Sequence, residues 1–544
     1  MSDWWRGAVI YQIYPRSFQD TNGDGIGDIP GITRRLEHVA KLGADAIWIS
    51  PVYPSPMQDM GYDVADYTGI DPVFGTLADF DAMLAEAHRL GLKVIVDQVL
   101  SHSSDRHPWF EESRMSRDNP KADWYVWADP RPDGSPPNNW LSVFGGSAWE
   151  WEARRRQYYL HNFLTSQPDL DFHNPAVQDA LLESVRFWLE RGVDGFRLDV
   201  VNFYVHDPEL RDNPALKNNW DRPAVNPYDM QDHRWDKSQP GTIDFIRRLR
   251  ALIEEYDART LMGEIGDSQR AMELMADYTR GADRLHKAYS FEFLGNDYSP
   301  DFFRTRIAGF FEAAPDGWPT WSFSNHDVIR HVTRWAPRAA DQGALARQAA
   351  ALLLSFEGSV CLYQGEELGL PEADILYEEL TDPPGIRFWP DYKGRDGCRT
   401  PMPWDDALPG CGFTEARPWL PVKPPHRALA VAAQERDPAS TLAFYRAMLA
   451  WRRGSRALRA GRTRFLDVAD PVLAFARAAE GDALTCVFNL SPEPVALGAD
   501  GFALAEAAPA QAAALEDGRL ALGPNGFAFL REGSGGGRLG RTGS

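Results

Sequence analysis

Short apolar runs of strand length recur along the chain, and each ends at a polar residue. Residues 94–96 lead into Asp97, and residues 195–198 lead into Asp199. Segments with the 3.6-residue period of an amphipathic helix follow most of these runs, and this alternation is typical of a parallel α/β fold. The expected strands cover residues 9–13, 46–49, 94–96, 195–198, 261–263, 290–293, 320–324 and 360–363.

The segments between the strands carry signals for the start and the end of helices. Asn174 and Pro175 supply an N-cap and a first-turn proline, and Gly192 can end the same helix. Thr76 and Asp79 form a capping-box pattern before another apolar stripe. Eight strand–helix units predict a TIM (β/α)8 barrel, whose active site lies at the carboxyl ends of the strands.

The chain is longer than a minimal barrel of about 250 residues, and the excess has identifiable places. Residues 98–173 are too long for a simple loop and are expected to form a subdomain inserted after the third strand. Residues 203–240 are expected to overhang the barrel mouth. The expected domains are a catalytic barrel over 1–97 and 174–462, the inserted subdomain, a C-terminal antiparallel β-sandwich over 463–532, and a flexible tail over 533–544.

Composition excludes several classes of protein. The 57 basic and 78 acidic residues give a net charge of −21, which disfavours binding to nucleic acid or to an anionic membrane. A hydrophobic content of 44% excludes a disordered chain, and no apolar run approaches the roughly 18 residues of a membrane span. The polar first residues predict no secretory signal, and the four cysteines form no C-x-x-C pair, so the expected location is the cytoplasm.

Carboxylates stand repeatedly where the expected strands end. They are Asp97, Asp199, Glu264 and Asp327. One acid at a strand end is ordinarily a helix cap or half of an ion pair, but four in register predict an active site. Arg197 precedes Asp199 by two residues and therefore shares its strand face, where its charge favours the ionised carboxylate.

Paired carboxyl groups are what glycoside hydrolysis requires. A retaining enzyme uses an ionised nucleophile and a protonated general acid about 5 to 5.5 Å apart. The 19 Trp, 18 Tyr and 28 Phe could in part bind sugar rings, although most of them are expected in the core. A metal-dependent barrel hydrolase is the alternative, and the scarcity of histidine near Asp97, Asp199 and Glu264 disfavours it.

The motifs resemble, in order and over nearly the whole chain, the signature regions of glycoside hydrolase family 13, the α-amylase family. The similarity is greatest to its bacterial α-glucosidase and oligo-1,6-glucosidase branch. The matching segments are IYQIYPRSF (10–18), DQVLSH (97–102), QPDLD (167–171), GFRLDV (195–200), GEI (263–265), SNHD (324–327) and RTPMPW (399–404).

This resemblance implies roles for individual residues. Asp199 would be the nucleophile, Glu264 the general acid/base and Asp327 the transition-state stabiliser. The substrate-binding residues implied are Asp59, Tyr62, His102, Phe144, Phe163, Arg197, Val200, Phe291, His326 and Arg399. An Asp59–Arg399 pair would close the pocket after one glucose, which predicts exo action. Ser101 departs from the family pattern, which has Asn before this His.

The segment from Asp20 to Asp28 spaces oxygen ligands at every second residue, with glycines between them. A loop that binds a hard cation needs oxygen ligands at such a spacing. An EF-hand-like loop or a plain polar turn can have the same spacing. No glutamate stands at the twelfth position, which disfavours an EF-hand. The spacing predicts one structural Ca²⁺ or Mg²⁺ with the ligands Asp20, Asn22, Asp24, the Ile26 carbonyl and Asp28, and no organic cofactor is expected.

The expected function is that of an exo-acting, retaining α-glucosidase that releases glucose from short maltose-type α-glucosides and can transfer it to other hydroxyl acceptors. Its partner is a small oligosaccharide or glucoside, and the sequence leaves monomer and dimer open. Val200 is the residue type that accompanies α-1,6 cleavage in this branch, whereas residues 229–240, 365–369 and 387–404 resemble bacterial α-glucosidases active on maltose, sucrose and aryl glucosides. An oligo-1,6-glucosidase and a sucrose-acting hydrolase or transferase therefore remain alternatives. A non-catalytic sugar-binding relative is disfavoured because Asp199, Glu264 and Asp327 are all present.

Overall fold

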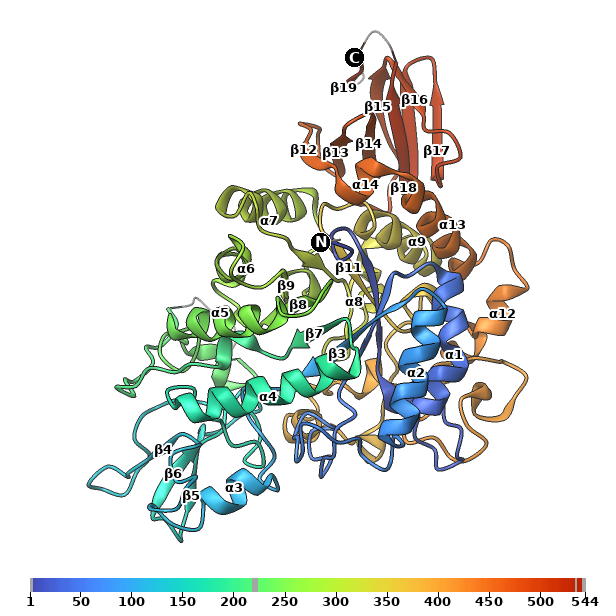
Figure 1. Ribbon diagram of the computed structural model, residues 1–544. Coiled ribbons are helices and arrows are strands. Elements are labelled where there is room, and N and C mark those ends of the chain that lie inside the picture. Colours follow the sequence, from blue (N-terminus) through green and yellow to red (C-terminus); the bar gives the residue numbers. More distant parts are fainter. Residues whose placement is uncertain (1–2, 218–223, 534–535, 541–544) are drawn as a thin grey trace.

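A computed structural model describes residues 3–217, 224–533 and 536–540 (Figure 1). Within these ranges the strands form an eight-stranded parallel sheet, an eight-stranded antiparallel sheet and a small three-stranded sheet. Figure 1 shows the parallel sheet in the centre, with the small sheet and the C-terminal sheet at opposite ends of the molecule.

The parallel sheet is the predicted TIM barrel. Its order is β10-β11-β1-β2-β3-β7-β8-β9, and a bridge between Ala288 and Pro319 joins its two ends. Alternate strand residues, such as Ile10, Trp48 and Met262, fill the inside, while their neighbours pack under the helices. The strands are β1 (Val9–Ile13), β2 (Ala46–Ile49), β3 (Lys93–Gln98), β7 (Gly195–Leu198), β8 (Thr260–Ile265), β9 (Lys287–Ser290), β10 (Thr320–Trp321) and β11 (Ser359–Tyr363).

One strand lies three residues earlier than the prediction. The expected strand 290–293 is wrong, because β9 covers Lys287–Ser290 and a 3-10 turn covers Glu292–Leu294. The apolar Phe293 stacks on Trp321 in the layer beneath the helices, with ring centroids 4.7 Å apart. Lys287 is buried in the barrel beneath the Trp4 ring, a position that its polarity conceals in the sequence.

The helices begin and end where their capping residues stand. The Asn174 side chain accepts a hydrogen bond from the Ala176 amide, and Gly192 ends this helix with φ 103°. Thr76 and Asp79 form the predicted capping box. The helices are α1 (Ile29–Leu42), α2 (Leu77–Arg89), α3 (Pro108–Ser113), α4 (Pro175–Arg191), α5 (Gly241–Ile253), α6 (Ala271–Thr279), α7 (Pro300–Ala313), α8 (His331–Arg334), α9 (Gln342–Leu353), α10 (Pro383–Arg387), α11 (Pro424–Ala428), α12 (Val431–Glu435), α13 (Thr441–Gly454) and α14 (Arg456–Ala460).

The predicted subdomain interrupts the barrel between β3 and α4. It contains α3 and the antiparallel strands β4 (Trp127–Ala128), β6 (Gln157–Leu160) and β5 (Trp149–Glu152), in that spatial order. Trp140 and Trp149 stack in its own small core, with ring centroids 5.9 Å apart. The carboxyl end of β3 therefore leads directly into a subdomain that has its own apolar core.

The predicted C-terminal antiparallel β domain is confirmed. The long strand β18 pairs with β14 and β15 and also with β16 and β17. One sheet face has its own apolar core, and the other packs on the barrel through contacts such as Phe356–Phe475, at 5.8 Å between ring centroids. The strands are β12 (Arg462–Phe465), β13 (Val472–Ala479), β14 (Asp482–Asn489), β15 (Val495–Asp500), β16 (Phe502–Leu504), β17 (Gln511–Glu516), β18 (Arg519–Glu532) and β19 (Arg538–Gly540).

The flexible tail expected over 533–544 needs a correction in part. Residues 538–540 form β19, which pairs antiparallel with β15 and satisfies backbone groups at that sheet edge. Residues 534–535 and 541–544 of the same segment lie outside the described residues, as do residues 218–223 of the second insertion. We propose that the other domains have the predicted bounds, since β3 ends at Gln98, α4 begins at Pro175 and β12 begins at Arg462.

Two further observations bear on the setting of the protein. In the part of the chain that the structure describes, no helix combines the length and the apolar character needed to cross a bilayer. All four cysteines, Cys361, Cys398, Cys411 and Cys486, are buried free thiols.

Candidate active site

Three carboxylates converge on one buried arginine at the carboxyl ends of adjacent barrel strands. Arg197 Nη1 lies 2.8 Å from Asp97 Oδ1 and 2.5 Å from Asp199 Oδ1, and its Nη2 lies 2.6 Å from Glu264 Oε1. Arg197 lies in β7, Asp97 in β3 and Glu264 in β8, and Asp199 directly follows β7. Strand β7 pairs with β3 on one side and with β8 on the other. The two ends of one planar guanidinium thereby hold Asp199 and Glu264 close together.

Glu264 receives two further hydrogen bonds. The Tyr289 hydroxyl donates to its Oε1 at 2.9 Å, and the Val200 amide donates to its Oε2 at 3.0 Å. Val200 adopts a left-handed backbone with φ 34°, an unfavourable conformation for a β-branched residue. This strained turn lets the residue after Asp199 orient the Glu264 carboxylate.

The pKa values of the Asp199 and Glu264 carboxyl groups are shifted toward neutral pH. Burial raises the pKa of Asp199 to about 7, against the opposing charge of Arg197. Burial also raises the pKa of Glu264 to about 7, and the Asp199 charge adds to this rise while Arg197 opposes it. Asp97 lies in the same cluster, and burial raises its pKa to about 6. Because one guanidinium faces three carboxyl groups, the cluster retains a proton near neutral pH, as an acid/base pair requires.

Asp327 has the opposite character. Arg399 Nη2 lies 3.0 Å and Arg395 Nη1 3.3 Å from its Oδ1, and His326 Nε2 lies 3.3 Å from its Oδ2. Burial alone would raise the pKa of Asp327, but these neighbours hold it below the ordinary value. Asp327 is therefore a fixed negative charge at the site.

The ion pair that Asp59 makes differs from the pocket-closing pair predicted from the sequence. Asp59 pairs with Arg395 at 2.7 Å, and not with Arg399. Asp382 holds Arg395 through its Nε and Nη2 at 3.0 and 2.7 Å, which directs the guanidinium toward Asp59. Arg399 is instead engaged by Asp327 and by the His326 carbonyl, at 2.7 Å from its Nε.

Hydrogen bonds orient the two histidines of the site. His102 Nε2 donates to the Tyr62 carbonyl at 3.1 Å, so its Nδ1 accepts from the Ser101 hydroxyl at 2.8 Å. Ser101 thus orients His102 although the family pattern has Asn there. Gln12 Nε2 lies 2.8 Å from His326 Nδ1, and the His326 ring stacks on Tyr62 at 5.2 Å. Burial lowers the pKa of His102 to about 4, so its ring is neutral.

These groups face one cavity of about 400 Å³. The predicted aromatic residues form part of its wall, with Phe144 and Phe163 packed edge to face at 5.5 Å. The predicted site residues that line it are Asp59, Tyr62, His102, Phe144, Phe163, Asp199, Val200, Glu264, Phe291, His326 and Asp327. Arg197 and Arg399 lie behind this wall, where they contact its carboxylates.

Several residues of the site were not found from the sequence. Arg395 stands four residues before Arg399, and the short 3-10 turn Asp396–Cys398 lies between them. Tyr289 lies two residues before Phe291, at the end of β9. The described part of the second insertion adds a wall of its own. The remaining lining residues are Val143, Val225, Asn226, Asp229, Pro384, Phe388, Asp391 and Tyr392.

The predicted cation loop is a tight turn that satisfies its own backbone. Asp20 Oδ1 accepts from the Asn22 and Gly23 amides at 3.0 and 2.8 Å, and Asp24 Oδ1 accepts from the Ile26 amide at 2.8 Å. Asp28 caps α1 by accepting from the Gly31 amide. No Lys, Arg or His among the described residues lies within 4.0 Å of the carboxylates of Asp20, Asp24 or Asp28.

Comparison with known proteins agrees with this geometry. The family profile "Alpha amylase, catalytic domain" matches residues 12–461. A "Probable alpha-glucosidase" of Rhizobium meliloti is 60% identical over 496 residues, which is 90% of each chain. An "Oligo-1,6-glucosidase" of Heyndrickxia coagulans is 37% identical over 532 residues, covering 91% of this chain and 93% of the relative. The crystal structure of the α-glucosyl transfer enzyme XgtA superposes with a TM-score of 0.94 at 53% identity, covering 98% of this chain and all of the other.

The barrel, the inserted subdomain and the paired carboxyl groups define a retaining glycoside hydrolase. The chain belongs to the α-amylase family, as the sequence motifs indicated.

Proposed function

We propose that the protein is an exo-acting α-glucosidase that removes one glucose from the non-reducing end of short α-glucosides and also transfers it to hydroxyl acceptors. The observation that carries this proposal is the composition of the cavity wall. Asp199 and Glu264 line the cavity and contact the Arg197 guanidinium, and the Asp59–Arg395 pair lies in the same wall. A cavity blocked in this way accommodates a terminal sugar and cannot thread a polymer.

The reaction follows from the two carboxyl groups. Asp199 attacks the anomeric carbon of the bound glucose, and the bond to the leaving oxygen breaks while Glu264 gives that oxygen its proton. The glucosyl ester on Asp199 is then attacked by water, whose proton passes to the Glu264 carboxylate. Two inversions release α-glucose, and a sugar hydroxyl in place of water gives the transfer product. Asp327, His102 and His326 would bind the hydroxyls of the same glucose.

A second candidate is an oligo-1,6-glucosidase. Val200 favours it, because valine directly after the nucleophile is the residue type that accompanies α-1,6 cleavage in the branch that the sequence resembles. In the structure Val200 lies in the cavity wall. The relative from Heyndrickxia coagulans carries that name, whereas the more similar relative is named an α-glucosidase.

A panel of maltose, isomaltose, sucrose and trehalose separates these candidates. We expect glucose release from maltose with a kcat/KM at least about tenfold above that for isomaltose, a difference of about 1.4 kcal/mol in transition-state binding. The reverse order would replace the leading proposal by the oligo-1,6-glucosidase. A preference for sucrose would assign the sucrose-acting alternative, and no glucose from any of the four would contradict all of them.

We also propose that the turn from Asp20 to Asp28 holds one Ca²⁺ or Mg²⁺ through Asp20, Asn22, Asp24, the Ile26 carbonyl and Asp28. Every donor is an oxygen, as a hard cation prefers. The three carboxylates have no cationic side chain beside them among the described residues, and Asp20 and Asp28 are buried. A cation there would neutralise this charge and fix the start of α1.

Removal of divalent cations is therefore expected to destabilise the protein. A cation at a hundred times its Kd contributes about 2.7 kcal/mol to the free energy of unfolding. We expect chelation to lower the Tm, added Ca²⁺ or Mg²⁺ to raise it again, and Asp24→Asn to abolish this response to Ca²⁺ or Mg²⁺. The control is Asp66→Asn, which alters an exposed turn carboxylate that likewise accepts bonds from residue i+2. An Asp24→Asn variant with the wild-type response would exclude this turn as the site.

The four buried free thiols support a further proposal, a cytoplasmic location, since exposure to an oxidising compartment favours disulfides. The proposed partner is a small oligosaccharide or glucoside.

A further inference from the structure

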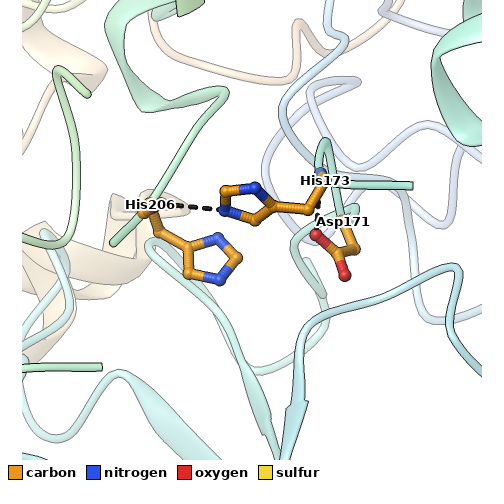
Figure 2. A group of neighbouring side chains, drawn as sticks. All are labelled: Asp171, His173 and His206. Atoms are coloured by element: carbon orange, nitrogen blue, oxygen red, sulfur yellow. Dashed lines mark hydrogen bonds between the residues drawn. The ribbon is translucent and has the colours of Figure 1, made fainter. Parts of the chain in front are cut away.

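A second constellation of titratable side chains lies away from the sugar cavity, where the inserted subdomain meets the barrel. Asp171 and His173 stand just before α4, and His206 lies in the segment after β7. One nitrogen of each histidine and one carboxylate oxygen of Asp171 lie within 4.8 Å of one another. The two imidazole rings meet edge to face, with centroids 4.8 Å apart, and the Asp171 carboxylate lies beside the His173 ring (Figure 2).

His173 is oriented as metal-bound histidines are. Its Nε2 lies 3.0 Å from the His206 carbonyl oxygen (Figure 2). Because a carbonyl can only accept, Nε2 carries a proton, which leaves Nδ1 as the nitrogen that can offer a lone pair. A backbone carbonyl that fixes the tautomer in this manner is the usual second partner of a metal-ligating histidine.

His206 is a buried polar side chain without a partner of its own. Its side chain is 7% exposed, and neither of its ring nitrogens makes a hydrogen bond to any described residue. Burial lowers the pKa of His206 to about 3, and the ring is therefore neutral. The ring borders a cavity, where its nitrogens have unused donor and acceptor capacity.

All three side chains border a cavity of about 390 Å³ between the subdomain and the segment after β7. Asp123 lies in the same wall and adds a second carboxylate. The cavity therefore brings two imidazoles and two carboxylates together, with Arg155 as a cation on its border.

We propose that Asp171, His173 and His206 bind a transition metal ion of the Zn²⁺ type, with the remaining coordination positions open to the cavity. Two nitrogen donors and one carboxylate suit Zn²⁺ and its neighbours, whereas Ca²⁺ prefers oxygen alone. Bond lengths of about 2.0 to 2.2 Å require the ligands to draw together. His173 is exposed and Asp171 half-buried, so these two side chains can rotate toward the fixed His206 ring.

The site has a mechanical consequence. The ion would join the start of α4 to the segment that runs from Asp199 to His206, and thus fasten one end of the segment that begins at the proposed nucleophile. Tyr204 in that segment already stacks on Phe172, with ring centroids 4.7 Å apart, so the ion would reinforce an existing contact. We expect it to stabilise the fold, and no step of glucoside cleavage passes through it.

The test is a binding experiment on the full chain, freed of metals and kept with Ca²⁺ to satisfy the turn at Asp20. Isothermal titration with Zn²⁺ should give one equivalent bound to the wild type and a rise in Tm. Co²⁺ should give the visible absorption of a site with nitrogen ligands. His173→Asn should lose the bound equivalent and the rise in Tm, and Asp171→Asn should weaken binding at least tenfold.

His173 is exposed, so its replacement should leave the fold intact, whereas His206→Gln alters a buried ring. The matched control is His88→Asn, because His88 Nε2 lies 2.6 Å from Asp194 Oδ2 in a pair that has no second histidine. This variant should bind Zn²⁺ as the wild type does. The proposal would be overturned by a wild type that binds no Zn²⁺, or by a His173→Asn variant that keeps the wild-type stoichiometry and affinity.

Discussion

Asp199→Asn is expected to lower kcat for glucoside hydrolysis by at least about 10⁴-fold, as the loss of the nucleophile does in a covalent mechanism. An amide cannot form the glucosyl ester. The fold should survive, because Asp97 and Glu264 still neutralise Arg197 at 2.8 and 2.6 Å. Glucose release at saturating maltose measures the effect, and thermal unfolding verifies the fold.

The control for this prediction is Asp118→Asn, which removes the same charge from an exposed position in the inserted subdomain. This variant should retain wild-type kcat. If Asp199→Asn hydrolysed maltose within tenfold of the wild type, Asp199 would not be the nucleophile, and the arrangement around Arg197 would need a different explanation.

The strand ends were the predictable part of this molecule. Asp97, Asp199 and Glu264 each follow or end an apolar run, and parallel strands bring such positions to one edge of the barrel. Local pattern and global fold agree here, so the sequence sufficed. The position of β9 was predicted wrongly because a lysine in the sequence usually marks the end of a buried strand. Lys287 is instead buried within the strand, and burial lowers its pKa to about 7.

The long-range pairings could not be predicted. Asp59 and Arg395 are brought together by Asp382, which lies in a segment without periodicity. Which of two nearby arginines reaches Asp59 depends on the third residue, and a linear pattern contains no such information. The same holds for His173 and His206, whose contact depends on how the inserted subdomain returns to the barrel.

The secondary structure of the C-terminal tail also depended on long-range pairing. The glycines from residue 533 onward resemble a flexible linker, yet Arg538–Gly540 pairs with β15. The pairing depends on an open edge of a sheet formed by residues some forty positions earlier, about which the local composition says nothing.

Glu264→Gln is expected to separate the two chemical steps. Glutamine cannot protonate the leaving oxygen, so kcat/KM for maltose should fall by about 10² to 10⁴, the usual contribution of general acid–base catalysis. In an aryl glucoside with an acidic phenol, the phenolate leaves without protonation. The first step with this substrate should therefore be much less affected by the substitution. The second step still lacks a base to activate water, and a glucosyl-enzyme on Asp199 should accumulate. Intact-protein mass spectrometry after mixing would detect it.

The pH profile gives this prediction a sign. The first step needs the protonated Glu264, so kcat/KM of the wild type for maltose should fall as the pH rises through the pKa of about 7. Glutamine does not titrate, and the variant should lose this alkaline limb. Glu273→Gln, a change at an exposed position on α6, should keep it. An alkaline limb that persists in Glu264→Gln would assign the titration to another member of the cluster around Arg197. The absence of a glucosyl-enzyme with the aryl substrate would contradict the role of Glu264 as the base.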